Sequence, residues 1–172
     1  MIGKSIRLRA LEPTDVDVLY NWENDTSVWK VSNTLTPFSK FVIEEYIACS
    51  HNDIYTTKQL RLIIELKETC QSIGAIDLFD FDPCNRRVGI GILIGEKDFR
   101  SKGYASEALE LMIKYVFNTL NLHQLYCNIL TDNEQSINLF SKFGFKTAGL
   151  KKDWIFYNNK WYDELLLQLI EN

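Results

Sequence analysis

The chain has 172 residues, of which 46% are hydrophobic and 24% are charged, and its formal net charge is -4. This length and composition fit one folded domain and exclude a disordered chain. The acidic balance disfavours nucleic acid as a partner and mildly favours a cationic one. No apolar stretch approaches the ~20 residues that cross a bilayer, and the charged N-terminus lacks a signal-peptide core. We therefore expect a single soluble, cytoplasmic domain over residues 1–172, with no membrane partner.

Apolar periodicity predicts the elements of the first half of the chain. Residues 6–10 alternate as in a half-buried strand. Residues 12–15 begin a helix, with an early proline and acids in the first turn, and a second helix follows Pro37. Three further strands are predicted at residues 59–67, 73–81 and 87–94.

A long amphipathic helix is predicted over residues 103–120, where apolar side chains recur at helical spacing and Glu110 pairs with Lys114 on the polar face. Residues 125–130 form the next predicted strand. Asp132 or Asn133 caps a short helix that ends near Gly144.

Two last strands, residues 145–157 and 161–170, meet at an Asn158-Asn159 pair with hairpin-turn chemistry. The order β-α-α-β-β-β-α-β-α-β-β predicts an α/β (α+β) fold, in which a mixed sheet carries helices on both faces.

The four cysteines form no C-x-x-C pair and have no neighbouring histidines that complete a zinc pattern: Cys49, Cys70, Cys84 and Cys127. We expect them to be reduced and structural, and we expect no metal site.

The strongest chemical signal is the run RSKGYA, which lies between a buried strand and the long helix and comprises Arg100, Ser101, Lys102, Gly103, Tyr104 and Ala105. A glycine there lets the backbone approach a ligand, and successive N–H groups at a helix N-terminus bind anions. The run is neither a P-loop nor a dinucleotide fingerprint. It predicts a pyrophosphate cradle; the alternative is an ordinary strand-to-helix turn with surface cations.

These residues resemble the coenzyme A motif [QR]-x-x-G-x-[GA] of the GCN5-related N-acetyltransferase (GNAT) family, matched by Arg100, Gly103 and Ala105. The opening at residues 6–15, the LNLH stretch at 120–123 and the helix at 133–145 also resemble that family. The resemblance implies a GNAT-like, mostly antiparallel sheet of six to seven strands, with acetyl-CoA as the acetyl donor. It further implies a backbone N–H near Leu93 or Ile94 that faces the thioester carbonyl. Asn133 matches a residue that contacts the pantetheine or its bound water, although it can also serve simply as a helix cap.

The DWIFYNNKWYD stretch at residues 153–163 is similar to a hairpin of spermidine N-acetyltransferases and ribosomal-protein alanine N-acetyltransferases. This implies a primary-amine acceptor, either spermidine or another polyamine, or alternatively a protein N-terminus or an aminosugar. A catalytically silent acyl-CoA-binding protein is the remaining alternative. The loop at residues 32–37 lacks the acidic pair that spermidine enzymes carry nearby. A homo-oligomer is expected from the family alone.

A protonated amine with a pKa near 10.4 needs roughly 4–5 kcal/mol to reach its neutral, nucleophilic form at neutral pH, and a carboxylate can bind it and accept its proton. Asp77, Asp80 and Asp82 lie on or just after one predicted strand. Strand alternation puts Asp77 and Asp80 on opposite faces, so one at most faces the acceptor unless a bulge intervenes. Asp80 is the first candidate by resemblance and Asp77 the second; the alternative is that these acids only keep the sheet soluble.

Many relatives carry a tyrosine, proposed to protonate the leaving thiolate, where this chain has Phe140. Phenylalanine cannot donate a proton. Tyr104, Tyr126 and Tyr157 are candidate substitutes, and nothing in the sequence selects one of them.

Overall fold

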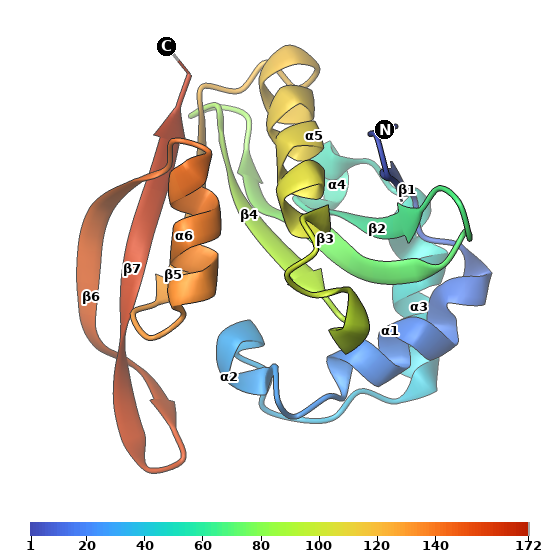
Figure 1. The fold of residues 1–172 in the computed structure, drawn as a ribbon, viewed down its shortest axis with the longest axis horizontal. Helices are drawn as coiled ribbons and strands as arrows, with labels where there is room; N and C mark the ends of the chain where they lie inside the picture. The colour runs from blue at the N-terminus through green and yellow to red at the C-terminus, as the bar shows by residue number, and fades with distance from the viewer. Residues whose placement is uncertain (172) are drawn as a thin grey trace.

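A seven-stranded sheet forms the centre of the computed structural model, which describes residues 1–171 (Figure 1). The strand order is β1-β2-β3-β4-β5-β7-β6, and every neighbouring pair is antiparallel except β4 and β5. The strands are β1 (Ile6–Arg9), β2 (Leu60–Leu66), β3 (Ser72–Asp82), β4 (Arg87–Ile94), β5 (Gln124–Leu130), β6 (Lys146–Tyr157) and β7 (Lys160–Ile170). The predicted mixed, mostly antiparallel sheet is confirmed.

Six α-helices accompany the sheet in residues 1–171: α1 (Val16–Glu23), α2 (Trp29–Ser32), α3 (Lys40–Ala48), α4 (Ile54–Thr57), α5 (Tyr104–Asn118) and α6 (Glu134–Lys142). The four longer ones confirm the predicted helices. The one-turn helices α2 and α4 were not predicted, because four residues are too few to display a helical period. None of the helices in the described residues is long and apolar enough to span a bilayer.

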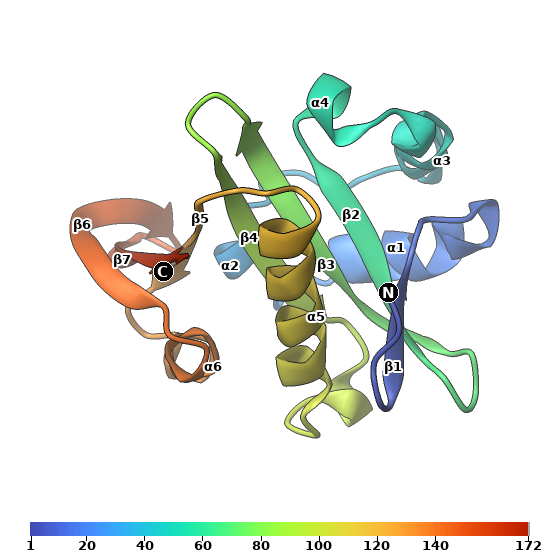
Figure 2. The ribbon, with the colours of Figure 1, turned by 90° about the horizontal axis from the view of Figure 1, so that it is seen from above.

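The helices cover both faces of the sheet, as predicted (Figure 2). On one face, α5 and α6 close the larger core; the buried residues of α5 are Ala108, Leu109, Met112 and Val116. On the other face, α1 and α3 pack Leu19, Trp22, Ile43 and Ile47 against Ile63 and Ala75 of the sheet. Each of the larger aliphatic side chains contributes about 1.5–3 kcal/mol by leaving water, and these two cores hold the strands in place.

Local chemistry sets the turns that were expected from the sequence. Asn158 and Asn159 take left-handed φ values of 49° and 57° between β6 and β7, as a tight hairpin requires. Gly144, at φ 87°, follows the C-cap of α6. The Asn133 side chain caps α6 by accepting a hydrogen bond from the Ser136 N–H at 3.2 Å.

The parallel pair β4 and β5 separates along its length. Only Arg87–Gly89 pairs with Gln124–Tyr126, although β4 runs on to Ile94 and β5 to Leu130. The Phe79 ring lies against Gly89 at the point of divergence, where a Cβ would come within 2.2 Å of it. Beyond that point the facing backbone edges of the two strands open into a gap, which positions the site described next.

Candidate active site

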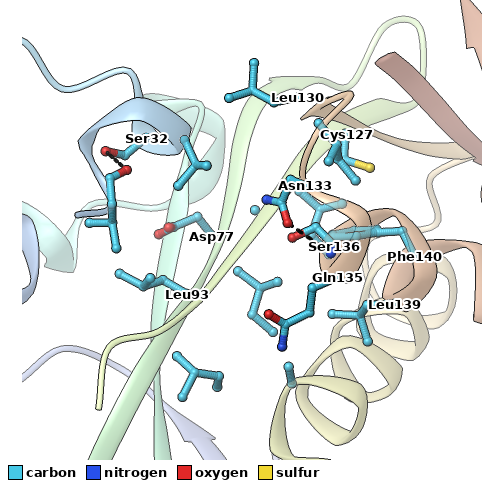
Figure 3. Close-up of a pocket in the computed structure, with 18 of the residues that line it drawn as sticks. Ser32, Asp77, Leu93, Cys127, Leu130, Asn133, Gln135, Ser136, Leu139 and Phe140 are labelled. Carbon is cyan, nitrogen blue, oxygen red and sulfur yellow. Dashed lines mark hydrogen bonds between the residues drawn. The ribbon is translucent and has the colours of Figure 1, made fainter. Parts of the chain in front are cut away.

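A cleft of about 1060 Å³ fills the gap between β4 and β5. Its walls come from the parts of β4 and β5 that no longer pair with each other, the helices α2, α5 and α6, and Asp77 and Phe79 of β3. Asp77 approaches the opening from one side, and Asn133 and Gln135 approach it from the other (Figure 3). Leu93 and Ile94, predicted to border a thioester carbonyl, line the cleft from β4.

The turn before α5 presents bare backbone to this cleft. Ser101 and Gly103 have φ values of 59° and 90°, and Gly103 is the N-cap of α5 with no side-chain cap. A Cβ placed on Gly103 would meet no atom within 4 Å. Among the described residues, the main-chain N–H groups from Ser101 to Ser106 have no hydrogen-bond partner. Successive free N–H groups at a helix N-terminus form an anion site, so the residues present fit a pyrophosphate.

The two cations of the turn have different positions. Arg100 lines the cleft, but its Nε donates to the Ile94 carbonyl at 2.9 Å, so the side chain braces the end of β4. Lys102 is exposed and does not line the cleft; its Nζ lies 5.3 Å from the Phe99 ring centroid. Tyr104 and Ala105 line the cleft on the first turn of α5.

A second helix N-terminus, that of α6, faces the same cleft. Gln135 Nε2 donates to Ser101 Oγ at 3.3 Å and thereby joins the two helix ends. Asn133, predicted as a contact for the pantetheine, lines the cleft while it caps α6. Both helix dipoles thus point their positive ends at one region.

A half-buried arginine organises the acid at the other side of the cleft. Arg61 of β2 donates through Nε to Asp77 Oδ1 at 2.6 Å and through Nη1 to Glu23 Oε1 at 2.5 Å. The Tyr46 ring lies 5.5 Å from its guanidinium. Burial acts to lower the pKa of Arg61, but Asp77 and Glu23 outweigh it and raise that pKa. The result is a fixed array of two carboxylates on one guanidinium, and Asp77 and Glu23 both line the cleft.

Asp80, the first acid candidate, lies outside the cleft-lining residues. It lies in the bulge that shifts the β3–β4 register between Phe79 and Asp82, with φ at 51°, and its Oδ2 accepts a hydrogen bond from Tyr126 at 3.2 Å. Burial, followed by the nearby Asp80, raises the pKa of Tyr126 to about 12. The predicted alternation fails here because the bulge intervenes: Leu78 and Phe81 both pack into the larger core, and Asp80 bonds Tyr126, whose ring packs against Phe79. Asp80 is thus on the same side of β3 as Phe79 but lies outside the cleft lining.

The comparisons with known proteins agree with this geometry. The model of the acetyltransferase (GNAT) domain matches residues 5–146. The chain belongs to the GNAT family of acetyltransferases. It is 31% identical to the uncharacterised N-acetyltransferase p20 of Bacillus licheniformis, over 96% of this chain and 93% of that protein. It is 26% identical to the spermidine N(1)-acetyltransferase of Escherichia coli K12, over 98% and 87%.

The GNAT fold also appears in a solved structure of a spermidine N-acetyltransferase from Vibrio cholerae, in complex with CoA and spermine. Its TM-score is 0.87 at 23% identity, and the match covers 96% of this chain and 95% of that one. The agreement extends over nearly the whole sheet and its helices, which confirms the fold expected from the resemblance.

Sequence reasoning missed several charged residues of this GNAT cleft: Glu23, Lys30, Arg61 and Glu164. Of these four residues, only Arg61 could have been placed near the site from a sequence pattern. It is the Cα partner of Asp77 in the β2–β3 ladder, and a turn centred near residue 69 predicts that pairing. The others come from elements far apart in sequence, so no local pattern could bring them together.

Proposed function

We propose that this chain transfers the acetyl group of acetyl-CoA to a primary amine, and that residues 1–172 act as one acetyltransferase domain. The observation that carries the proposal is the cleft between β4 and β5. It has an uncapped, glycine-led helix N-terminus at one end and a carboxylate, Asp77, at the other. One end suits a diphosphate, and the other suits an ammonium ion.

The donor's diphosphate would be held by the main-chain N–H groups of Ser101, Gly103, Tyr104 and Ala105, in the dipole field of α5. The backbone edge at Leu93 and Ile94 would lie along the thioester arm, with Asn133 opposite. Arg100 supports this edge through its bond to the Ile94 carbonyl. Lys102 would add only long-range positive charge, since its side chain is directed away from the cleft.

Acetyl-CoA supplies a thioester, and in the reaction a nitrogen–carbon bond forms while the carbon–sulfur bond breaks. The part of this chain is to bind the amine and remove its proton. Asp77 has acceptor capacity left after its bonds to Arg61, because a carboxylate offers about four lone-pair sites. We propose Asp77 as the residue that binds the ammonium and accepts its proton, directly or through water.

The thiolate must leave without help from Phe140, which is buried and packs edge-on against Phe145, with ring centroids 5.0 Å apart. Tyr104 is the one tyrosine of the described residues that lines the cleft. A thiol with a pKa of about 8–9 is a good leaving group, so water can supply the proton. We propose that no side chain is essential for this step.

The relatives that act on spermidine make a polyamine the first acceptor to test. A protein N-terminus and an aminosugar are the alternatives, because they present the same primary amine. The experiment is a thiol-release assay with acetyl-CoA and each class of amine, with the acetylated product identified by mass. Thiol release without an acetylated amine, or none with any amine, contradicts the proposal.

A homo-oligomer is also proposed. Trp154, Phe156 and Trp161 on the β6–β7 hairpin are each more than half exposed, and an exposed aromatic patch commonly marks an interface. Light scattering of the purified protein gives the mass directly; a monomer at micromolar concentration contradicts this part.

A further inference from the structure

The amine end of the cleft has an unusual distribution of charge. Its lining includes three acids, Glu23, Asp77 and Glu164, and two cations, Lys30 and Arg61. Glu164 of β7 pairs with Lys151 at 2.8 Å, and its side chain is only 13% exposed. This pair is matched one to one and leaves no free charge.

Lys30 forms a second matched pair on the wall opposite β3. Its Nζ lies 2.5 Å from Asp132 Oδ2 and 3.7 Å from the centroid of the Tyr162 ring, and its side chain is only 21% exposed. The ammonium is therefore held between α2, the β5–α6 turn and β7. Lys30 lines the cleft and Asp132 does not, so this pair turns its positive end toward the cleft.

In the third group the charges do not balance, because one cation, Arg61, forms ion pairs with both Glu23 and Asp77, at 2.5 and 2.6 Å. One negative charge is left uncompensated there, and it can be neutralised by one ammonium ion. A second positive charge on the same acceptor would have no free carboxylate to bind, because Glu164 is already paired with Lys151. It would also be repelled by Lys30.

We infer that the acceptor is an amine with a single positive charge, whose remaining part is neutral or anionic, and that polyamines are disfavoured. This inference rests on the proposed function and narrows its acceptor. Lys30 is the residue that discriminates, through charge repulsion, and Asp77 with Glu23 supplies the one site for an ammonium.

The test uses three acceptors with the same reacting amine and six carbons: hexylamine, 6-aminohexanoate and 1,6-diaminohexane, with spermidine as the fourth. Their distal ends are neutral, negative and positive. We expect kcat/KM for the diamine and spermidine to be lower than for hexylamine by about tenfold or more, from thiol release. A diamine or spermidine used as well as hexylamine overturns the inference and leaves the proposed function standing. No activity with any of the four amines overturns the inference, and the proposed function is also contradicted only if peptides and aminosugars are inactive as well.

Charge-reversal variants test the role of Lys30 directly. Lys30→Glu should raise the ratio of diamine to hexylamine activity by about tenfold or more, and Lys30→Gln should raise it less. The matched control is Lys40→Glu, since Lys40 is an exposed lysine outside the cleft that also pairs with an aspartate, Asp17, at 2.6 Å. Unchanged ratios in both Lys30 variants, or an equal change in the control, overturn the inference.

Discussion

Asp77 is the ladder partner of Arg61 and lines the cleft, whereas Asp80, three residues further along β3, accepts a hydrogen bond from Tyr126 outside the cleft. The bulge after Phe79 breaks the strand alternation, and it places the second carboxylate beside Tyr126 instead of in the cleft. The two acids are close in sequence but have different surroundings, so their substitution should affect activity differently.

Replacing Asp77 by Asn keeps the shape of the side chain but removes its negative charge and its ability to accept a proton. We expect kcat/KM to fall by about 10²–10⁴-fold, the usual contribution of a positioned base. The matched control is Asp80→Asn, which should stay within about twofold. Steady-state thiol release at several pH values measures both; a larger loss in the Asp80 variant contradicts the assignment.

Gly103→Asp should weaken coenzyme A binding by about 100-fold or more, because it places a carboxylate in the proposed diphosphate cradle. Titration calorimetry with CoA measures the affinity. Gly144→Asp is the control for backbone strain, since Gly144 has φ at 87° but lies outside the cleft. Equal affinities of the Gly103 variant and the wild type for CoA would contradict the assignment of this turn as the diphosphate site.

Gly95→Ala should destabilise the fold by about 1–3 kcal/mol, because the new methyl group would lie 2.4 Å from Trp22 Nε1. Trp22 is buried and donates to Glu96 at 3.0 Å, so the ring cannot move away easily. The control is Gly91→Ala, whose nearest atom would be a Phe79 ring carbon at 3.8 Å. The melting temperature of the Gly95 variant should be lower than that of the Gly91 variant. Equal melting temperatures would show that the Trp22 ring moves aside without cost.

Burial raises the pKa of the Cys127 thiol from 9.0 to about 12. The unfolded chain then loses this proton at lower pH than the folded one, so the free energy of unfolding should decline between pH 9 and pH 12. Cys127→Ala should lack that part of the decline, as measured by urea unfolding at each pH.

At pH 8 the native protein should react with a thiol reagent at the exposed Cys49, Cys70 and Cys84 but not at Cys127. Four rapidly reacting thiols would contradict this.

The sequence alone determined the features that depend on near neighbours in the chain. The strand order along the chain, the long helix α5, the cap at Asn133 and the Asn158-Asn159 turn were all readable, because each depends on the period or chemistry of a few adjacent residues. The placement of Gly103 ahead of α5 was readable for the same reason.

Only the tertiary structure decided which acid faces the cleft and what surrounds it. Alternation predicted opposite faces for Asp77 and Asp80, but the bulge after Phe79 breaks that alternation, and the divergence of β4 from β5 determines that Asp77 borders the cleft. Arg61, Glu23 and Lys30 come from three separate elements, and packing brings each of them beside a charge from a distant part of the chain. Such long-range contacts leave no periodic trace in the chain, because their energy depends on distances that exist only after folding.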